Sequence, residues 1–217
     1  MYFKNRTEAG AYLAAALKQY RYDNCAVVAL NDGGVVVGEE IAGFLHCVLT
    51  MLLTEKIDIP GEHLLFGTVD QKGSFVYNHM FSTGEFEDYY QEFHSYLEDQ
   101  KREKFQLINR LLGDGGILDE SMLRRHVVIL VSDGLPTGAS LEAAAAFLKP
   151  IHIARLIIAT PVASVPAVDR MHILADELHV LNVTDNYLDT NHYYDENVIP
   201  SHDETIKKLN QIVLKWK

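Results

Sequence analysis

Short, uninterrupted runs of apolar residues alternate with amphipathic segments along most of the 217-residue chain. The clearest run is residues 127–131, which a polar, glycine-containing loop ends and an alanine- and leucine-rich segment at 139–148 follows. Such a run, rich in Val and Ile, predicts a strand covered on both faces, as in a parallel sheet, followed by a helix. Similar runs predict further strands at 25–30, 48–53, 153–159 and 178–183.

Helical periodicity fills most of the intervals between these runs. Asn5 with Glu8 three residues on forms a plausible capping box for the first helix. The pattern predicts helices over 11–20, 35–46, 168–176 and 206–214, and a hairpin of 64–69 with 75–77. A long amphipathic helix is predicted within 85–112, and its aromatic stripe is interpreted as core or a dimer contact rather than a base-stacking platform. The stripe consists of Phe86, Tyr89, Tyr90, Phe93, Tyr96 and Leu97.

Alternating strands and helices predict an α/β fold with a mainly parallel, twisted sheet flanked by helices. At this length, residues 1–217 are expected to form a single domain. Residues 62–116 and the carboxyl-terminal segment 185–217 are candidates for a small hood or flap beside the sheet. The aromatic stripe also suggests, weakly, a homodimer.

The composition of the chain restricts the classes of ligand and partner that we expect. A hydrophobic content of 48% and a charged content of 23% are ordinary for a globular protein. The net charge of −11 disfavours broad surfaces for nucleic acid or membranes, so a phosphorylated ligand would have to be held by local geometry. Cys25 and Cys47 lie in apolar runs and are interpreted as buried free thiols. No apolar run approaches the ~20 residues of a membrane helix, and no targeting segment is evident, so we expect a cytoplasmic protein.

The loop after residues 127–131 carries the most chemistry. If the preceding run is a parallel strand, the loop lies at the carboxyl edge of the sheet, where the following helix directs its N–H groups and dipole outward. Thr137 and Ser140 add hydroxyls, and Gly134 and Gly138 allow close approach of a ligand. Asp133 is a candidate for holding a metal ion or a sugar hydroxyl. This pattern predicts a site for a sugar phosphate.

A second glycine-containing turn, residues 31–34, follows the strand at 25–30. Glycines there allow unusual backbone angles. Neither turn matches the P-loop or the GxGxxG pattern. If both turns lie on one edge of one sheet, they describe the crevice in which ligands of open α/β sheets usually bind.

The segment VVILVSDGLPTGAS resembles the ribose-phosphate-binding loop of type I phosphoribosyltransferases. Weaker likenesses follow in order along nearly the whole chain. They comprise Phe3-Lys4-Asn5-Arg6 with Ala9-Gly10 and Leu13-Ala14, Val27–Leu30 with Gly33-Gly34, Lys56-Ile57 with Pro60-Gly61, and Tyr193-Tyr194 with the acidic stretch after it.

The resemblance implies a type I phosphoribosyltransferase-like fold and a ligand such as phosphoribosyl pyrophosphate (PRPP) or a nucleoside 5′-phosphate, with transfer of ribose 5-phosphate to or from a nitrogenous base. Mg²⁺ would accompany PRPP. Asp133 would be the catalytic position, hold a ribose hydroxyl and meet the metal indirectly, through the ligand. The pyrophosphate-binding residues would be Asp32, Gly33, Gly34 and Lys56. The phosphate- and ribose-binding residues would be Ser132, Asp133, Gly134, Leu135, Pro136, Thr137, Gly138, Ala139 and Ser140.

Three positions depart from the family pattern. Ser132 stands where the family has an acidic residue, and Asp32 and Glu55 stand where it has arginine. An anion in place of a cation repels pyrophosphate, by about 4 kcal/mol for a pair at ~4 Å and an effective dielectric of ~20. A catalytically degenerate protein with a binding or regulatory role therefore stays open as the alternative.

Other interpretations have less support. Residues 129–134 also resemble a strand end of von Willebrand A domains, but the Asp-x-Ser-x-Ser motif of those domains is missing. Asp189, His192 and Asp195 could suggest a metal site, although a solvated turn is the simpler explanation in a loop rich in Asn and Tyr.

Overall fold

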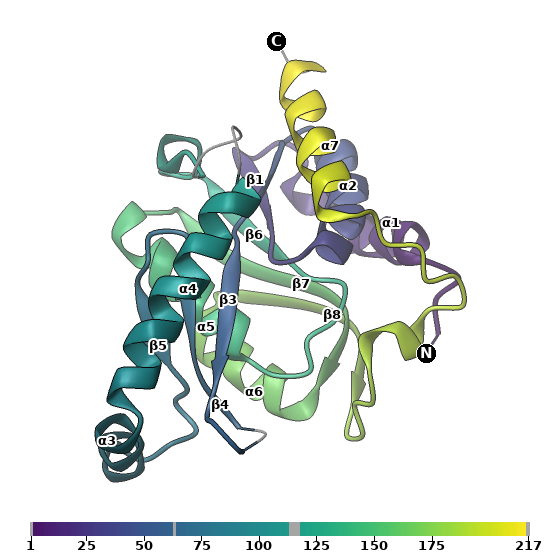
Figure 1. Ribbon diagram of the computed structural model, residues 1–217. Coiled ribbons are helices and arrows are strands. Elements are labelled where there is room, and N and C mark those ends of the chain that lie inside the picture. Colours follow the sequence, from purple (N-terminus) through teal and green to yellow (C-terminus); the bar gives the residue numbers. More distant parts are fainter. Residues whose placement is uncertain (1, 63, 113–117, 216–217) are drawn as a thin grey trace.

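The computed structural model describes residues 2–62, 64–112 and 118–215, with side chains described through 209 (Figure 1). Two sheets organise the chain, a parallel one and a smaller antiparallel one. Residues 63 and 113–116 of the predicted hood, and 216–217 at its carboxyl-terminal end, lie outside the described residues. Within the described residues, no helix combines the length and the apolar character that crossing a membrane requires.

The larger sheet has the order β2-β1-β6-β7-β8, and all of its strand pairs are parallel. This arrangement confirms the predicted parallel α/β fold. β6 coincides with the predicted strand at 127–131, because a run of Val, Ile and Leu buried on both faces leaves little ambiguity about its limits. The strands are β1 (Cys25–Ala29), β2 (Val48–Met51), β6 (Val127–Val131), β7 (Arg155–Ser164) and β8 (Glu177–Thr184).

Alternate residues of the central strands belong to two separate cores. Val27, Ile129 and Ile157 pack with α1 and α2, whereas Val28 and Leu130 pack with α5 and α6 on the opposite face. The helices are α1 (Arg6–Ala16), α2 (Asp32–Leu45), α3 (Thr83–Glu92), α4 (His94–Leu112), α5 (Ala139–Leu148), α6 (Val165–Leu174) and α7 (His202–Lys215), and short 3₁₀ helices cover Lys18–Tyr20, Glu120–Met122, Lys149–Ile151 and Thr190–Tyr193.

The smaller sheet is antiparallel, in the order β3 (Thr54–Asp58), β4 (Leu65–Asp70) and β5 (Phe75–Tyr77). The predicted hairpin is confirmed as β4 and β5. The hydrophobic pattern did not predict β3, because its alternation of polar residues with the buried Ile57 is too short to stand out from a loop. α4 packs across β3 and β4 (Figure 1).

The aromatic segment differs from the single helix predicted over 85–112. Phe93 ends α3, and α4 begins at His94. Leu97 is fully buried, and Phe86, Tyr89, Tyr90 and Phe93 pack against the core of this chain, which confirms the core interpretation. Five of the six stripe residues thus pack within this chain, and the homodimer stays a prediction.

β7 is longer than predicted and continues through Pro161 to Ser164. The strand was predicted to end at residue 159, before Pro161, and proline cannot donate to a sheet. The strand tolerates it because β6 has already ended, with Val131 opposite Ala159, and because the pairing with β8 skips Pro161. The extra residues of β7 then support the loop that follows β6.

Cys25 and Cys47 are free and buried, as predicted. Burial raises the pKa of the Cys25 thiol to about 11 and that of Cys47 to about 12. Because the thiolate is the reactive form, we expect iodoacetamide at pH 8 to label neither residue in the folded protein. Mass spectrometry should find both labelled after unfolding in guanidinium, and rapid native labelling would contradict the burial described here.

Candidate functional site

The two glycine-containing turns lie next to each other at the carboxyl edge of the parallel sheet. β1 pairs with β6, with Ala29 opposite Val131, and the Leu30 N–H donates to the Val131 carbonyl at 2.9 Å. The chain leaves β1 to enter α2 and leaves β6 to enter α5 at this same edge. The expected crevice between two adjacent strand ends is therefore present.

A cavity of about 490 Å³ opens at this edge. It brings together the loop after β6, the end of β1, and charged residues of β3 and α4. The described lining residues are Leu30, Asn31, Thr54, Glu55, Lys56, Asp58, Lys104, Ser132, Gly134, Leu135, Pro136, Thr137, Ser140 and Thr190. Most of the predicted loop residues and Lys56 thus share one cavity.

We refer to residues 135–140, at the start of α5, as the phosphate cup, after the ligand that the sequence predicts for this loop. Leu135 anchors the cup to β7, since its N–H donates to the Val162 carbonyl at 3.0 Å and its carbonyl accepts from the Ser164 N–H at 3.0 Å. The Leu135 N–H is therefore not available to a ligand. Gly138 occupies the N-cap position of α5 without a side chain to cap the helix. The first N–H groups of α5 consequently remain available, beside the hydroxyls of Thr137 and Ser140.

Lys56 of β3 and Lys104 of α4 line the same cavity as the cup. Lys56 is exposed on β3 and lines the cavity. Glu55, one of the departures from the family pattern, forms an ion pair with Lys104 of α4 at 3.4 Å. Lys104 therefore offsets the negative charge of Glu55.

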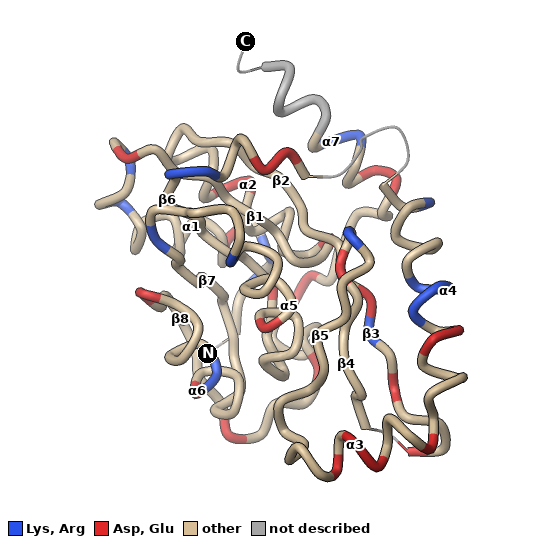
Figure 2. Tube along the Cα trace, turned by 90° about the vertical axis from the view of Figure 1, so that its left-hand side faces the viewer, with Lys and Arg blue, Asp and Glu red and all other residues tan. Residues whose placement is uncertain are grey.

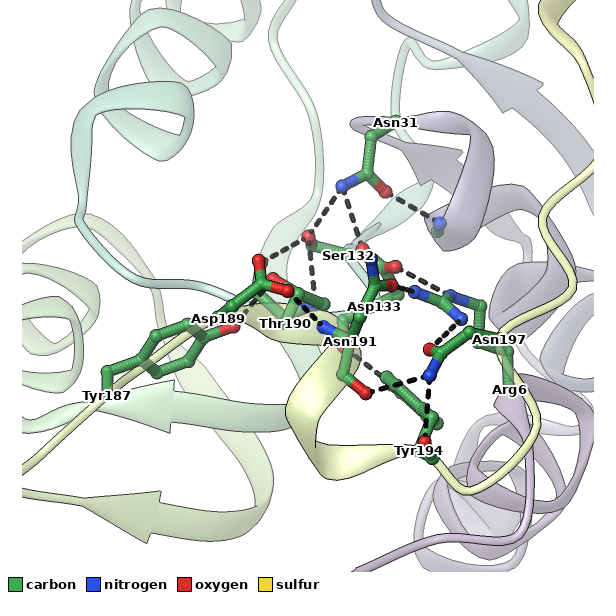
Figure 3. A network of polar contacts seen from close by, with 12 residues as sticks. Arg6, Asn31, Ser132, Asp133, Tyr187, Asp189, Thr190, Asn191, Tyr194 and Asn197 are labelled. Atoms are coloured by element: carbon green, nitrogen blue, oxygen red, sulfur yellow. Dashed lines mark hydrogen bonds and ion pairs between the residues drawn. The ribbon is translucent and has the colours of Figure 1, made fainter.

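Asp133 does not line the cavity, although it was predicted to be the central acidic residue. It is only 4% exposed, and its Oδ2 atom accepts a 2.7 Å hydrogen bond from Arg6 Nε of α1. Its Oδ1 atom accepts from Asn31 Nδ2 at 2.8 Å. Both carboxylate oxygens are thus engaged within the protein, as Figure 3 shows.

The carboxyl-terminal segment covers the same loop from the other side. The Tyr194 hydroxyl donates to the Asp133 carbonyl at 2.6 Å. Tyr187 and Thr190 hydrogen-bond to each other and pack on Gly134 so closely that a Cβ there would lie 2.7 Å from Thr190 Cγ2. Burial raises the pKa of Tyr187 to about 12, and burial also raises the pKa of Tyr194. Both phenols therefore remain protonated donors at neutral pH.

The predicted pyrophosphate residues of the other turn lie outside the described lining of the cavity. Asp32, Gly33 and Gly34 form the first turn of α2 rather than a loop with unusual angles, and neither glycine has a positive φ. The Asp32 carboxylate contacts His202 Nδ1 at 3.0 Å, at the start of α7. Asn31, the N-cap of α2, lines the cavity in their place.

The residues present do not form a ready site for a free divalent ion. In the part of the chain that the structure describes, no group of three or more His, Cys, Asp or Glu side chains is arranged to hold a metal. The Asp133 carboxylate is directed to Arg6 and Asn31, so the indirect metal contact expected of it does not fit this geometry. Asp189, His192 and Asp195 form no metal cluster either.

The residues of this region that were not predicted as site residues include Arg6, Asn31, Lys104 and Thr190. Asn31 carried a usable signal, since Asn is a preferred N-cap residue directly before a helix. Arg6 and Lys104 carried none, because charged residues at the surface of a predicted helix are ordinary. Only the tertiary structure brings them to the loop after β6.

This arrangement is that of a type I phosphoribosyltransferase fold: a parallel sheet flanked by helices, whose central strand leads into a helix N-terminus facing a cavity. The model of the phosphoribosyl transferase domain family matches residues 3–197. The chain therefore belongs to this family.

Individual relatives agree with this assignment. The crystal structure of TT1426 from Thermus thermophilus superimposes with a TM-score of 0.75 at 28% identity, covering 98% of this chain and 99% of that one. Provisionally named phosphoribosyl transferases of Mycobacterium tuberculosis strains CDC 1551 / Oshkosh and H37Rv are each 27% identical over 96% of this chain. The alignment covers 46% of those proteins, so this chain spans about half the length of the curated relatives it matches.

Proposed function

We propose that the protein binds PRPP or a nucleoside 5′-phosphate and transfers ribose 5-phosphate to or from a nitrogenous base. The observation that carries this proposal is the uncapped N-terminus of α5, with the hydroxyls of Thr137 and Ser140, in one cavity with Lys56. Partial positive charge and N–H donors at one end and an ammonium at the other suit a ligand with phosphates at both ends.

In this proposal the phosphate cup holds the 5-phosphate through the first N–H groups of α5 and the two hydroxyls. Lys56 neutralises the pyrophosphate as it leaves. The chain's contribution is positioning and charge neutralisation, which an oxocarbenium-like ribose needs more than a strong base. We assign no ribose contact to Asp133, because Arg6 and Asn31 engage both of its carboxylate oxygens.

Mg²⁺ is proposed as a companion of PRPP, brought in on the ligand's own oxygens. Magnesium keeps several waters and commonly binds through substrate phosphates, so it does not require a protein cage. No step is assigned to it here.

The degenerate alternative rested on Ser132, Asp32 and Glu55. Lys104 offsets the charge of Glu55, and the Asp32 carboxylate contacts His202 outside the described lining of the cavity. The Ser132 hydroxyl donates to the Gly134 carbonyl at 2.9 Å and so shapes the loop. These contacts reduce the expected repulsion and favour the transferase.

The surroundings fit a small ligand rather than a polyanion. Acidic residues run along α3 without a basic one, and α4 carries both signs (Figure 2). With a net charge of −11, the chain favours local capture of a phosphate over a nucleic-acid surface.

Two cysteines without a disulfide also support our proposal that the protein acts in the cytoplasm. We further propose that residues 62–116 and 185–217 act as the hood beside the ligand.

Calorimetric titration with PRPP, with and without Mg²⁺, tests the binding, and pyrophosphate release with a panel of bases tests the transfer. We expect Mg²⁺-dependent binding with release. Binding without release would support the degenerate alternative, and absence of binding would contradict the proposal.

Lys56→Ala should weaken PRPP binding about tenfold, because it removes the cation that faces the cup. Lys18→Ala removes another exposed ammonium, outside the described lining of the cavity, and serves as the matched control. Equal affinities of the two variants would show that Lys56 does not meet the ligand.

A further inference from the structure

Arg6 connects three segments that are far apart in the sequence. Its side chain extends from the first turn of α1 and is 1% exposed. Nε donates to Asp133 at 2.7 Å, Nη2 to Asn191 Oδ1 at 2.7 Å and Nη1 to Asn197 Oδ1 at 3.3 Å (Figure 3). The guanidinium carbon also lies 4.3 Å from the centre of the Tyr194 ring. All three nitrogens of the guanidinium thus have partners within the protein.

The partners of Arg6 belong to two segments that each contribute other residues to the lining of the cavity. Asp133 lies two residues before the cup, and its backbone carbonyl accepts from the Tyr194 hydroxyl. Asn191 follows Thr190, which lines the cavity. One buried side chain therefore fixes both the loop after β6 and the segment 190–197 that packs over it.

The charge of Asp133 makes this connection relevant to a phosphate. A carboxylate buried next to an anion site repels the anion strongly, because little water is present to screen it. The Arg6 guanidinium at 2.7 Å compensates that charge inside the protein. A bidentate or branched set of contacts of this kind suits arginine and not lysine, whose ammonium is a single point.

We propose that Arg6 is a positioning residue: it neutralises Asp133 behind the phosphate cup and holds residues 190–197 against the loop, so that Asp133 supports the cup from within instead of binding ribose. The claim that Arg6 supports ligand binding by neutralising Asp133 rests on the proposed function. The claim that Arg6 holds residues 190–197 against the loop does not depend on it. Each claim is tested by its own experiment.

Hydrogen exchange tests the positional part without any ligand. Arg6→Lys keeps the charge but loses the branched donors, so amides of residues 187–197 should exchange about tenfold faster than in the wild type. Arg21→Gln, at an exposed arginine, is the matched control and should leave this segment unchanged. Unchanged exchange in Arg6→Lys would overturn this part of the proposal, whatever the protein binds.

Titrations with PRPP plus Mg²⁺ and with inorganic phosphate test whether anion binding requires Arg6 to compensate the charge of Asp133. Arg6→Gln leaves Asp133 uncompensated and should weaken both ligands about tenfold or more. Arg6→Gln with Asp133→Asn restores a neutral pair and should return both affinities to within about threefold of the wild type. Where Arg6→Gln does not fold, the double variant is compared directly with the wild type.

Two results would overturn the charge argument. A folded double variant that binds both ligands about tenfold more weakly than the wild type would show that neutralisation is not what matters. A double variant that keeps inorganic phosphate but loses PRPP would show that Asp133 binds ribose after all. If the wild type binds neither ligand, the proposed function fails, and the exchange experiment still decides the role of Arg6 in holding residues 190–197.

Discussion

Gly33→Ala is expected to lower the free energy of unfolding by about 3 kcal/mol or more. A Cβ at this position would overlap the Asp133 Oδ2 atom and lie 2.9 Å from Arg6 Nε. Gly33 has ordinary helical dihedral angles, which alanine also adopts. The destabilisation would therefore come from steric overlap of the added Cβ with its neighbours. Asp133 would have to move away from Arg6, and separating a buried ion pair leaves two uncompensated charges.

Gly43→Ala provides the control within the same helix. No atom lies within 4 Å of a Cβ built at Gly43. Because alanine has a higher helix propensity than glycine, the free energy of unfolding of this variant should rise by about 0.5 to 1 kcal/mol. Urea unfolding followed by circular dichroism measures both variants. Similar stabilities for the two would mean that Asp133 is not packed against α2 as described.

The contrast between these glycines illustrates what the sequence could and could not predict. Glycines after a strand indicated a turn open to a ligand. In the structure, Gly33 makes room for Asp133, Gly134 makes room for Tyr187 and Thr190, and Gly138 lies against Arg170. The protein's own side chains approach these glycines, and no local pattern distinguishes that reason from a bound ligand.

The fold was predictable where local and global preferences agree. The apolar run 127–131 and the helix 139–148 coincide with β6 and α5, because burial on both faces and alanine-rich periodicity each allow one assignment. The prediction was wrong where tertiary structure overrides the pattern, as in β7 beyond Pro161 and in the unpredicted strand β3.

The same difference applies to the candidate site: local patterns predicted some of its residues, and tertiary contacts determined the roles of others. Thr137, Ser140 and Lys56 were predicted to share a site and line one cavity, since the cup follows from a strand–loop–helix signal. The engagement of Asp133 by Arg6 could not be predicted, because 127 positions separate the partners. A charged residue's sequence context does not reveal whether its charge faces a ligand or another residue.

Ser140→Asp should weaken the binding of PRPP and of inorganic phosphate about thirtyfold while leaving the fold intact or more stable. Ser140 lies in the first turn of α5 and lines the cavity, so the new carboxylate would face the bound phosphate. Two like charges at ~4 Å and an effective dielectric of ~20 repel by about 4 kcal/mol, and screening by half leaves about 2 kcal/mol. An acidic side chain in a first helical turn stabilises the helix by about 0.3 to 1 kcal/mol.

The opposite signs of these two effects make the measurement decisive, because general damage to the fold would lower stability and affinity together. Ser95→Asp, in the exposed first turn of α4, adds the same charge in the same kind of position and should leave affinity unchanged. Calorimetric titration of each variant, with thermal unfolding beside it, separates the outcomes. If Ser140→Asp binds phosphate as tightly as Ser95→Asp does, the anion does not lie at the start of α5, and the phosphate cup has been assigned to the wrong residues.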